Sequence, residues 1–146
     1  MGALYSRSEE ETERIGERMG KLLRPGDVVA FTGGLGMGKT CFVRGLARGM
    51  GLLTPVYSPT FSLVNEYQGP LPLCHFDMYR ITDLDDLYST GFFDYLDTGA
   101  VLAVEWSENI VDALPDHTIT VAFARAGDEA RTITVKGDER FADFGD

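Results

Sequence analysis

The sequence has few cysteines and lacks a long apolar run. Cys41 and Cys74 are too few and too far apart to form a thiolate metal site, and we expect both to be buried, reduced thiols. No stretch approaches the ~20 apolar residues that span a bilayer. The N-terminal region carries four glutamates within residues 9–13, where a secretory signal would be apolar. We therefore expect a soluble, cytoplasmic protein without a membrane segment.

Lysine is also scarce, with three in 146 residues, and the formal net charge is −10. A protein that holds a nucleic-acid backbone by itself needs clustered lysines and arginines, so this composition argues against such a protein. The acidity is most simply explained by a solvated surface, and it also permits a basic protein partner. A chain of this length, with 44% apolar residues, has enough material for one core, so we expect a single domain over residues 1–146.

A glycine-rich loop followed by lysine and threonine is the strongest motif present. Residues 33–40 read GGLGMGKT, which fits G-x-x-x-x-G-K-[ST] at each fixed position, and an apolar run precedes them at 28–31. Glycines let backbone N–H groups turn toward phosphate oxygens, the lysine adds a charge, and the threonine hydroxyl can bind Mg²⁺. The N-terminus of the following helix favours the same anion. We predict nucleotide contacts from Gly33, Gly34, Leu35, Gly36, Met37, Gly38, Lys39, Thr40 and Cys41.

The remaining pattern predicts an α/β fold. The capping box at 8–11 begins an amphipathic helix that we expect to end at Pro25-Gly26. The expected elements that follow are a strand at 28–32, a helix at 39–50, two hairpin-like strands at 61–67 and 71–76, a short acidic helix near 84–88, and strands at 101–104, 118–124 and 132–135. Together they predict one P-loop NTPase-like domain, with a mixed, mostly parallel sheet, flanking helices and a β-hairpin.

Two apolar strands end in an acid, as a P-loop requires for its metal. Asp77 follows Leu73-Cys74-His75-Phe76, and Glu105 follows residues 101–104. Ligands of open α/β sheets collect at the carboxyl ends of strands, so either acid could face the loop, although each could instead be a solvated carboxylate or a helix cap. Thr60, within Ser58-Pro59-Thr60-Phe61, occupies the position at which P-loop switch proteins sense the γ-phosphate.

The segments GGLGMGKT, SPTF with VNEY, HFDMYR and VEW together resemble the TsaE (YjeE) family of bacterial P-loop ATPases, in order and spacing over residues 8–110. The resemblance implies an ATP- and Mg²⁺-dependent subunit of the machinery that makes N6-threonylcarbamoyladenosine in tRNA. Such a subunit works with TsaB and TsaD and meets tRNA only through the complex. Gly34 and Met37 depart from the usual family loop at positions whose side chains the phosphate chemistry does not need.

Carried over to this sequence, the family pattern implies roles for four side chains in catalysis. Lys39 would contact phosphate, Asp77 would be the Walker-B-like acid, Thr60 would belong to the switch, and Glu105 would lie near Mg²⁺ or the hydrolytic water. The implied metal ligands are Thr40, Asp77 and Glu105, and Trp106 would pack alongside.

Several residues keep more than one interpretation. We expect His75 to pack or hydrogen-bond near the site rather than act as a base, and Arg80 could pair equally with a carboxylate or a phosphate. Ser8 is a candidate for the adenine side because the start of its helix could lie beside the P-loop. Glu66-Tyr67 could be a motif or a surface pair, and the aromatic run at 92–95 is expected to be core.

Two other functions are compatible with the P-loop. One is a small metabolite kinase, although such enzymes close an arginine-bearing lid over the phosphates and no arginine cluster of that kind occurs in the second half of the sequence. The other is a non-enzymatic interaction module whose docking surface changes on nucleotide binding.

Overall fold

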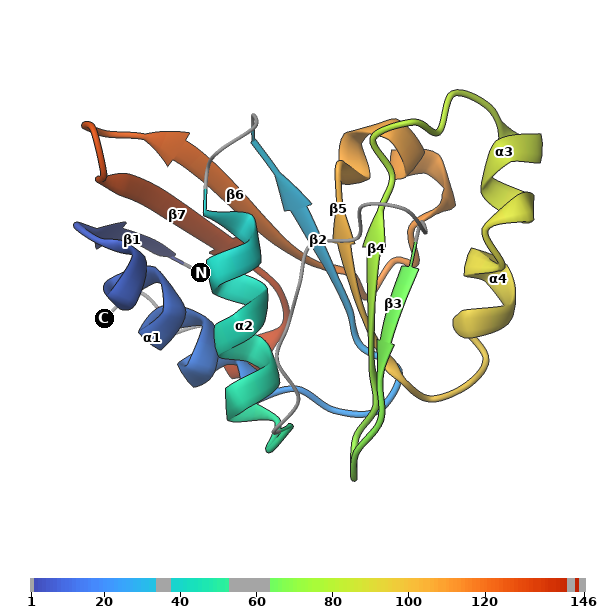
Figure 1. Cartoon of the computed structure of the whole chain (residues 1–146), viewed down its shortest axis with the longest axis horizontal. Coiled ribbons are helices and arrows are strands. Elements are labelled where there is room, and N and C mark those ends of the chain that lie inside the picture. Colours follow the sequence, from blue (N-terminus) through green and yellow to red (C-terminus); the bar gives the residue numbers. More distant parts are fainter. Residues whose placement is uncertain (1, 34–37, 53–63, 142–143, 145–146) are drawn as a thin grey trace.

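The fold is built on one seven-stranded sheet with the order β1-β7-β6-β2-β5-β4-β3 (Figure 1). The computed structural model describes residues 2–33, 38–52, 64–141 and 144. The strands are β1 (Gly2–Ser6), β2 (Val28–Thr32), β3 (Val64–Tyr67), β4 (Leu73–Asp77), β5 (Val101–Glu105), β6 (Ile119–Arg125) and β7 (Arg131–Lys136).

The sheet is mixed, as the sequence predicts. Strand β2 pairs in parallel with β5 and β6, and β4 pairs in parallel with β5. The pairs β1–β7, β6–β7 and β3–β4 are antiparallel, so five strands run one way and β3 and β7 run the other. The β3–β4 pair is the expected hairpin, and its predicted first three residues, 61–63, lie outside the described residues. Strand β2, which precedes the P-loop, lies at the centre of the sheet, with three strands on each side.

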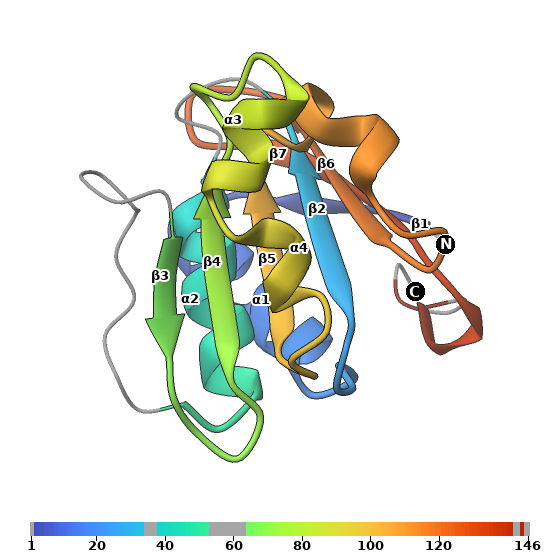
Figure 2. The same ribbon diagram turned by 90° about the vertical axis from the view of Figure 1, so that its right-hand side faces the viewer.

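Helices cover both faces of this sheet (Figure 2). Helices α1 (Glu9–Gly20) and α2 (Lys39–Gly49) pack on one face, and α3 (Leu84–Ser89), α4 (Phe92–Tyr95) and the 3₁₀ segment η1 (Ser107–Ala113) lie on the other. A second 3₁₀ turn, η2 (Glu139–Phe141), follows β7. Successive strand residues point to opposite faces, so Val28 belongs to the core that contains Leu87 and Phe92, and Val29 belongs to the core that contains Met19 and Phe42.

Helices α1 and α2 meet through glycines spaced four residues apart on each helix. A Cβ atom added to Gly16 or Gly20 of α1 would overlap the backbone carbonyls of Phe42 and Leu46. A Cβ atom added to Gly45 or Gly49 of α2 would likewise overlap backbone carbonyls of α1. The two backbones approach this closely only because these four residues lack side chains, and the contact sets the position of α2 relative to α1.

The structure corrects some of the expected boundaries. The first helix ends at Gly20, with Lys21 as its C-cap, and not at Pro25-Gly26, because the chain turns there through bonds from Leu22 to Met19 and from Leu23 to Gly20. Strand β1, helix α4 and the 3₁₀ segments η1 and η2 are additional to the elements that we expected. Within the described ranges, no helix is both long and apolar enough to cross a bilayer.

Candidate nucleotide-binding site

The two described ends of the P-loop are glycines with positive φ angles. Gly33 follows β2 with φ 127°, and a Cβ atom there would lie 2.8 Å from the carbonyl oxygen of Phe123. Gly38 has φ 84° and is the N-cap of α2. The positive φ angle disfavours residues other than glycine at both positions, and the close contact with Phe123 disfavours them further at Gly33. The predicted contacts Gly34, Leu35, Gly36 and Met37 lie outside the described residues.

The first turn of α2 presents backbone donors at the end of the loop. Phe42 N donates to Gly38 O at 3.0 Å, so the N–H groups of Lys39, Thr40 and Cys41 lie ahead of the helical ladder. These N–H donors and the positive end of the helix dipole both favour the binding of an anion at this position. The Cys41 side chain is buried, and its Sγ accepts a 3.8 Å bond from Arg44 Nη1, so its backbone, not its thiol, is suited to contact a phosphate.

The ammonium group of Lys39 lies at the centre of the site. Its Nζ donates to Gly33 O at 2.6 Å and lies 4.7 Å from the centroid of the Trp106 ring. The residue is 5% exposed, and this burial lowers the pKa of Lys39, while the negative charges of Glu105, Glu108 and Asp77 act in the opposite direction. A cation held out of water by one carbonyl and an aromatic ring is placed to bind an anion.

Both predicted acids lie at the edge of the sheet where the P-loop strand ends. Strand β5 is the direct neighbour of β2, β4 is the next strand, and Asp77 and Glu105 are register partners. The Asp77 side chain accepts a hydrogen bond from Tyr79 N at 3.0 Å, which fixes the turn after β4. Glu105 has the largest electrostatic effect of the three carboxylates on Lys39. The third expected catalytic side chain, Thr60, lies outside the described residues.

A buried histidine holds the Glu105 carboxylate. His75 Nε2 lies 2.5 Å from Glu105 Oε2; His75 is fully buried and Glu105 is 8% exposed. Among the described residues, His75 Nδ1 has no hydrogen-bond partner. A short bond to a fixed ring limits the rotation of the carboxylate, so His75 is suited to position Glu105.

The residues after Glu105 complete one wall of the site. Trp106 has a left-handed backbone with φ 59°, and its ring packs edge-on against Tyr79 with centroids 4.9 Å apart. Ser107 is buried, and its Oγ donates to Phe31 O at 2.9 Å, which ties the start of η1 to β2. Sequence reasoning missed Ser107 and Glu108 because no motif marks them; the only signal was their position just after a strand-end acid.

Asp77 and Glu105 are too few to hold a metal ion by themselves, but they could do so together with other ligands. Within the described part of the chain, no group of three or more His, Cys, Asp or Glu residues is arranged to hold a metal ion. Mg²⁺ is commonly bound through one or two carboxylates together with phosphate oxygens and water. The placement of Asp77 and Glu105 near the first turn of α2, which carries Thr40, agrees with this type of coordination.

The start of α1 borders the P-loop. Ser8 Oγ accepts a bond from Glu11 N at 3.2 Å and so caps α1. One turn later, the Thr12 methyl carbon lies 3.8 Å from the position that a Cβ atom at Gly38 would occupy. The residue of α1 that borders Gly38 is therefore Thr12, and the Ser8 side chain serves as a helix cap.

The remaining residues that the sequence left with more than one interpretation lie in different parts of the fold. Arg80 is exposed just after β4. Of the aromatic run expected to be core, Phe92 is fully buried, whereas Phe93 and Tyr95 are partly buried and pack against that core from its edge. Glu66 is exposed on β3, whereas Tyr67 is buried, so only the tyrosine of this pair packs within the fold. Cys41 and Cys74 are buried free cysteines, as expected.

Comparisons with known proteins identify related sequences and a related structure. The family model described as threonylcarbamoyl adenosine biosynthesis protein TsaE matches residues 6–133. A tRNA threonylcarbamoyladenosine biosynthesis protein TsaE from Treponema pallidum is 42% identical over 130 residues, covering 89% of this chain and 96% of the relative. The protein of the same name from Bacillus subtilis is 40% identical over 126 residues, covering 86% and 78%. The crystal structure of Bacillus subtilis YdiB superposes with a TM-score of 0.78 at 33% identity, covering 98% of this chain and 90% of that one.

Proposed function

Because the chain belongs to the TsaE family of threonylcarbamoyl adenosine biosynthesis proteins, we propose that it is the Mg²⁺-dependent, ATP-hydrolysing subunit required for N6-threonylcarbamoyladenosine modification of tRNA. It acts with TsaB and TsaD, and tRNA is reached only through that complex. The observation that carries the ATPase assignment is the convergence of Lys39, Asp77 and Glu105 at the carboxyl edge of β2, β5 and β4.

Each group at this edge has a task that its surroundings support. Bound Mg²⁺–ATP would supply the phosphoanhydride to be cleaved and the metal that neutralises its charge. The Lys39 ammonium would exchange Gly33 O for phosphate oxygen, and the first-turn N–H groups of α2 would donate to the same phosphates. Thr40, Asp77 and Glu105 would hold the metal.

Glu105 is also placed to orient the attacking water. Its carboxylate is directed by His75 and lies on the strand next to the P-loop strand. Thr60 is retained as the proposed switch residue on the strength of the family pattern. The segment around Trp106 and Ser107 links the Glu105 strand to Lys39 and to β2, so it connects the acid to the phosphate-binding lysine.

The test is ATP turnover by the purified chain, measured alone and with TsaB and TsaD. We expect slow turnover alone and strong stimulation by the two subunits, with Lys39→Ala inactive in both conditions. Lack of stimulation would contradict a partner-regulated ATPase. ATP consumption matched by a phosphorylated small-molecule acceptor would support the metabolite kinase instead.

A further inference from the structure

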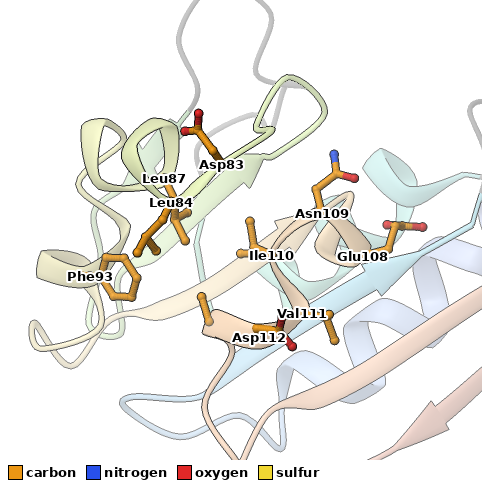
Figure 3. A pocket seen from close by; sticks show the side chains of 10 residues that line it. Asp83, Leu84, Leu87, Phe93, Glu108, Asn109, Ile110, Val111 and Asp112 are labelled. Carbon is orange, nitrogen blue, oxygen red and sulfur yellow. The ribbon is translucent and has the colours of Figure 1, made fainter.

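An open groove lies between α3 and η1, beyond Glu105 and Trp106. It has a volume of about 590 Å³, and its apolar part comes from Leu84, Leu87, Phe93, Ile110 and Val111. Figure 3 shows the first three on one side, Ile110 opposite them, and Val111 farther along η1. Leu87 and Ile110 are buried, whereas Leu84 and Val111 are 57% and 63% exposed. The groove therefore has an apolar floor and apolar, solvent-facing walls.

The exposed apolar surface continues along α3. Leu84 and Tyr88 are four residues apart and lie on one side of this helix. Tyr88 is 61% exposed and packs on Phe93, with ring centroids 4.7 Å apart. A continuous patch of large exposed side chains next to a groove is typical of a protein-binding surface.

The rim of the groove is acidic. Asp83, Glu108 and Asp112 line it, and Figure 3 shows them spaced around the apolar side chains. Residues 81–124, which include the whole groove, contain nine of the 23 acidic residues and none of the 13 lysines and arginines. The rest of the chain, with 14 acidic and 13 basic residues, is nearly neutral. The net charge of the protein is thus concentrated in the segment of the sequence that contains this groove.

We propose that the α3–η1 groove binds a basic, amphipathic segment of a partner protein in the modification complex. Its apolar side chains would fill the space between Leu84 and Val111, and flanking lysines or arginines would face the three carboxylates. The same charge excludes a nucleic-acid backbone as the occupant. The partner's identity rests on the proposed function, whereas the chemistry of the segment follows from the groove itself.

Segment η1 connects the groove to the nucleotide site. Segment η1 begins directly after Glu105-Trp106, and its Glu108 both lines the groove and acts electrostatically on Lys39. Asn109 Nδ2 donates to Met78 O at 2.8 Å and so ties η1 to the turn after Asp77. A segment seated against η1 would contact the element that directly follows Glu105 and Trp106.

The test uses the full chain and a fluorescent helical peptide of about 18 residues, with leucines at spacings of three and four and lysines elsewhere. We expect saturable binding that weakens about fivefold or more in Asp112→Arg and about tenfold in Val111→Ser. Glu129→Arg, which makes the same charge change on the exposed β6–β7 turn, should bind the peptide as the wild type does. Absence of binding, or equal weakening in Asp112→Arg and Glu129→Arg, would overturn the proposal.

Two further measurements separate this inference from the proposed function. A purified TsaB–TsaD mixture should displace the peptide, and failure to displace it would overturn the assignment of this groove to that complex. ATP binding by the same variants should equal that of the wild type, because none of the substituted residues lies in the nucleotide site. If the wild type bound the peptide but not ATP, the proposed ATPase would fail while the groove assignment stood.

Discussion

Lys39 and Trp106 form the smallest unit on which the proposed chemistry depends. The ammonium group rests between Gly33 O and the indole ring, and burial lowers the pKa of this lysine. Trp106 is the single tryptophan of the chain, so its fluorescence reports on the position of the Lys39 side chain. A phosphate that draws the ammonium away from the ring would change that fluorescence.

We expect Lys39→Met to weaken ATP binding by about 10- to 150-fold, because a charged hydrogen bond contributes about 1.5–3 kcal/mol. In the wild type, titration of Mg²⁺–ATP should change the Trp106 emission, with the affinity checked by calorimetry. Lys21→Met, an exposed substitution at the end of α1, is the matched control. Wild-type affinity in Lys39→Met would contradict the role of this lysine.

At the scale of elements, the α1–α2 contact fixes the helix that follows the P-loop. We expect Gly45→Ala to lower the free energy of unfolding by about 2–3 kcal/mol, since its methyl group would overlap the backbone of Glu13 and separate the helices. Chemical denaturation measures this change. At Gly127 a Cβ atom would make only a 3.4 Å contact with Ala130, so Gly127→Ala should change stability by less than about 0.5 kcal/mol. Equal stability of the two variants would exclude the close helix contact.

Arg140 joins the C-terminal η2 turn to the start of the P-loop strand. Its guanidinium forms bonds of 2.8 and 3.1 Å to the buried carboxylate of Asp27. We expect Arg140→Met to cost about 3 kcal/mol of unfolding free energy, because it leaves a buried charge unpaired. Arg125 is exposed at the end of β6, so Arg125→Met serves as the control in the same urea titration. A small loss of unfolding free energy of similar size in the two variants would contradict this account.

The exposed partner of Arg140 gives a pH test at the same junction. Hydrogen bonds from Arg140 hold the pKa of Asp138 at about 2, below its usual 3.8. The Asp138 carboxyl therefore loses its proton more readily in the folded state than in the unfolded state. The contribution of the ionised carboxylate to the free energy of unfolding is complete above pH 3.8 and is lost as pH falls through about 2. We expect Asp138→Asn to be less stable than the wild type at pH 6 and equal to it near pH 2, measured by urea unfolding. A difference independent of pH would contradict the linkage.

At the scale of the whole molecule, the parts of the fold that depend on local signals could be predicted from the sequence. The P-loop with its strand and helix, and the two strands that end in Asp77 and Glu105, follow from motif and periodicity. Strand β1 could not be predicted, because it exists by pairing with β7, with Gly2 opposite Val135. The glycines of α1 and α2 weaken helix propensity locally, and only the contact between the helices explains them.

For the candidate site, the sequence predicted which residue types take part better than it predicted how they are arranged. The motifs predicted Lys39 and both acids as site residues, whereas the pairing of His75 with Glu105 depends on the register of β4 and β5. The roles of Ser107 and Glu108 depend on the turn after β5, for which the sequence carries no motif. Long-range strand pairing and side-chain packing decided these positions.

The measurement that tests the central claim most directly is tRNA threonylcarbamoylation reconstituted with TsaB, TsaD and either the wild-type chain or Glu105→Gln, with ATP turnover followed in the same reaction. We expect the variant to bind ATP but to lose turnover by about 100-fold or more, as for removal of a group that activates water, and to lose tRNA modification with it. The exposed Glu129→Gln is the control and should behave as the wild type. Full modification by Glu105→Gln without ATP turnover would contradict the proposed ATPase and would favour a module gated by nucleotide binding alone.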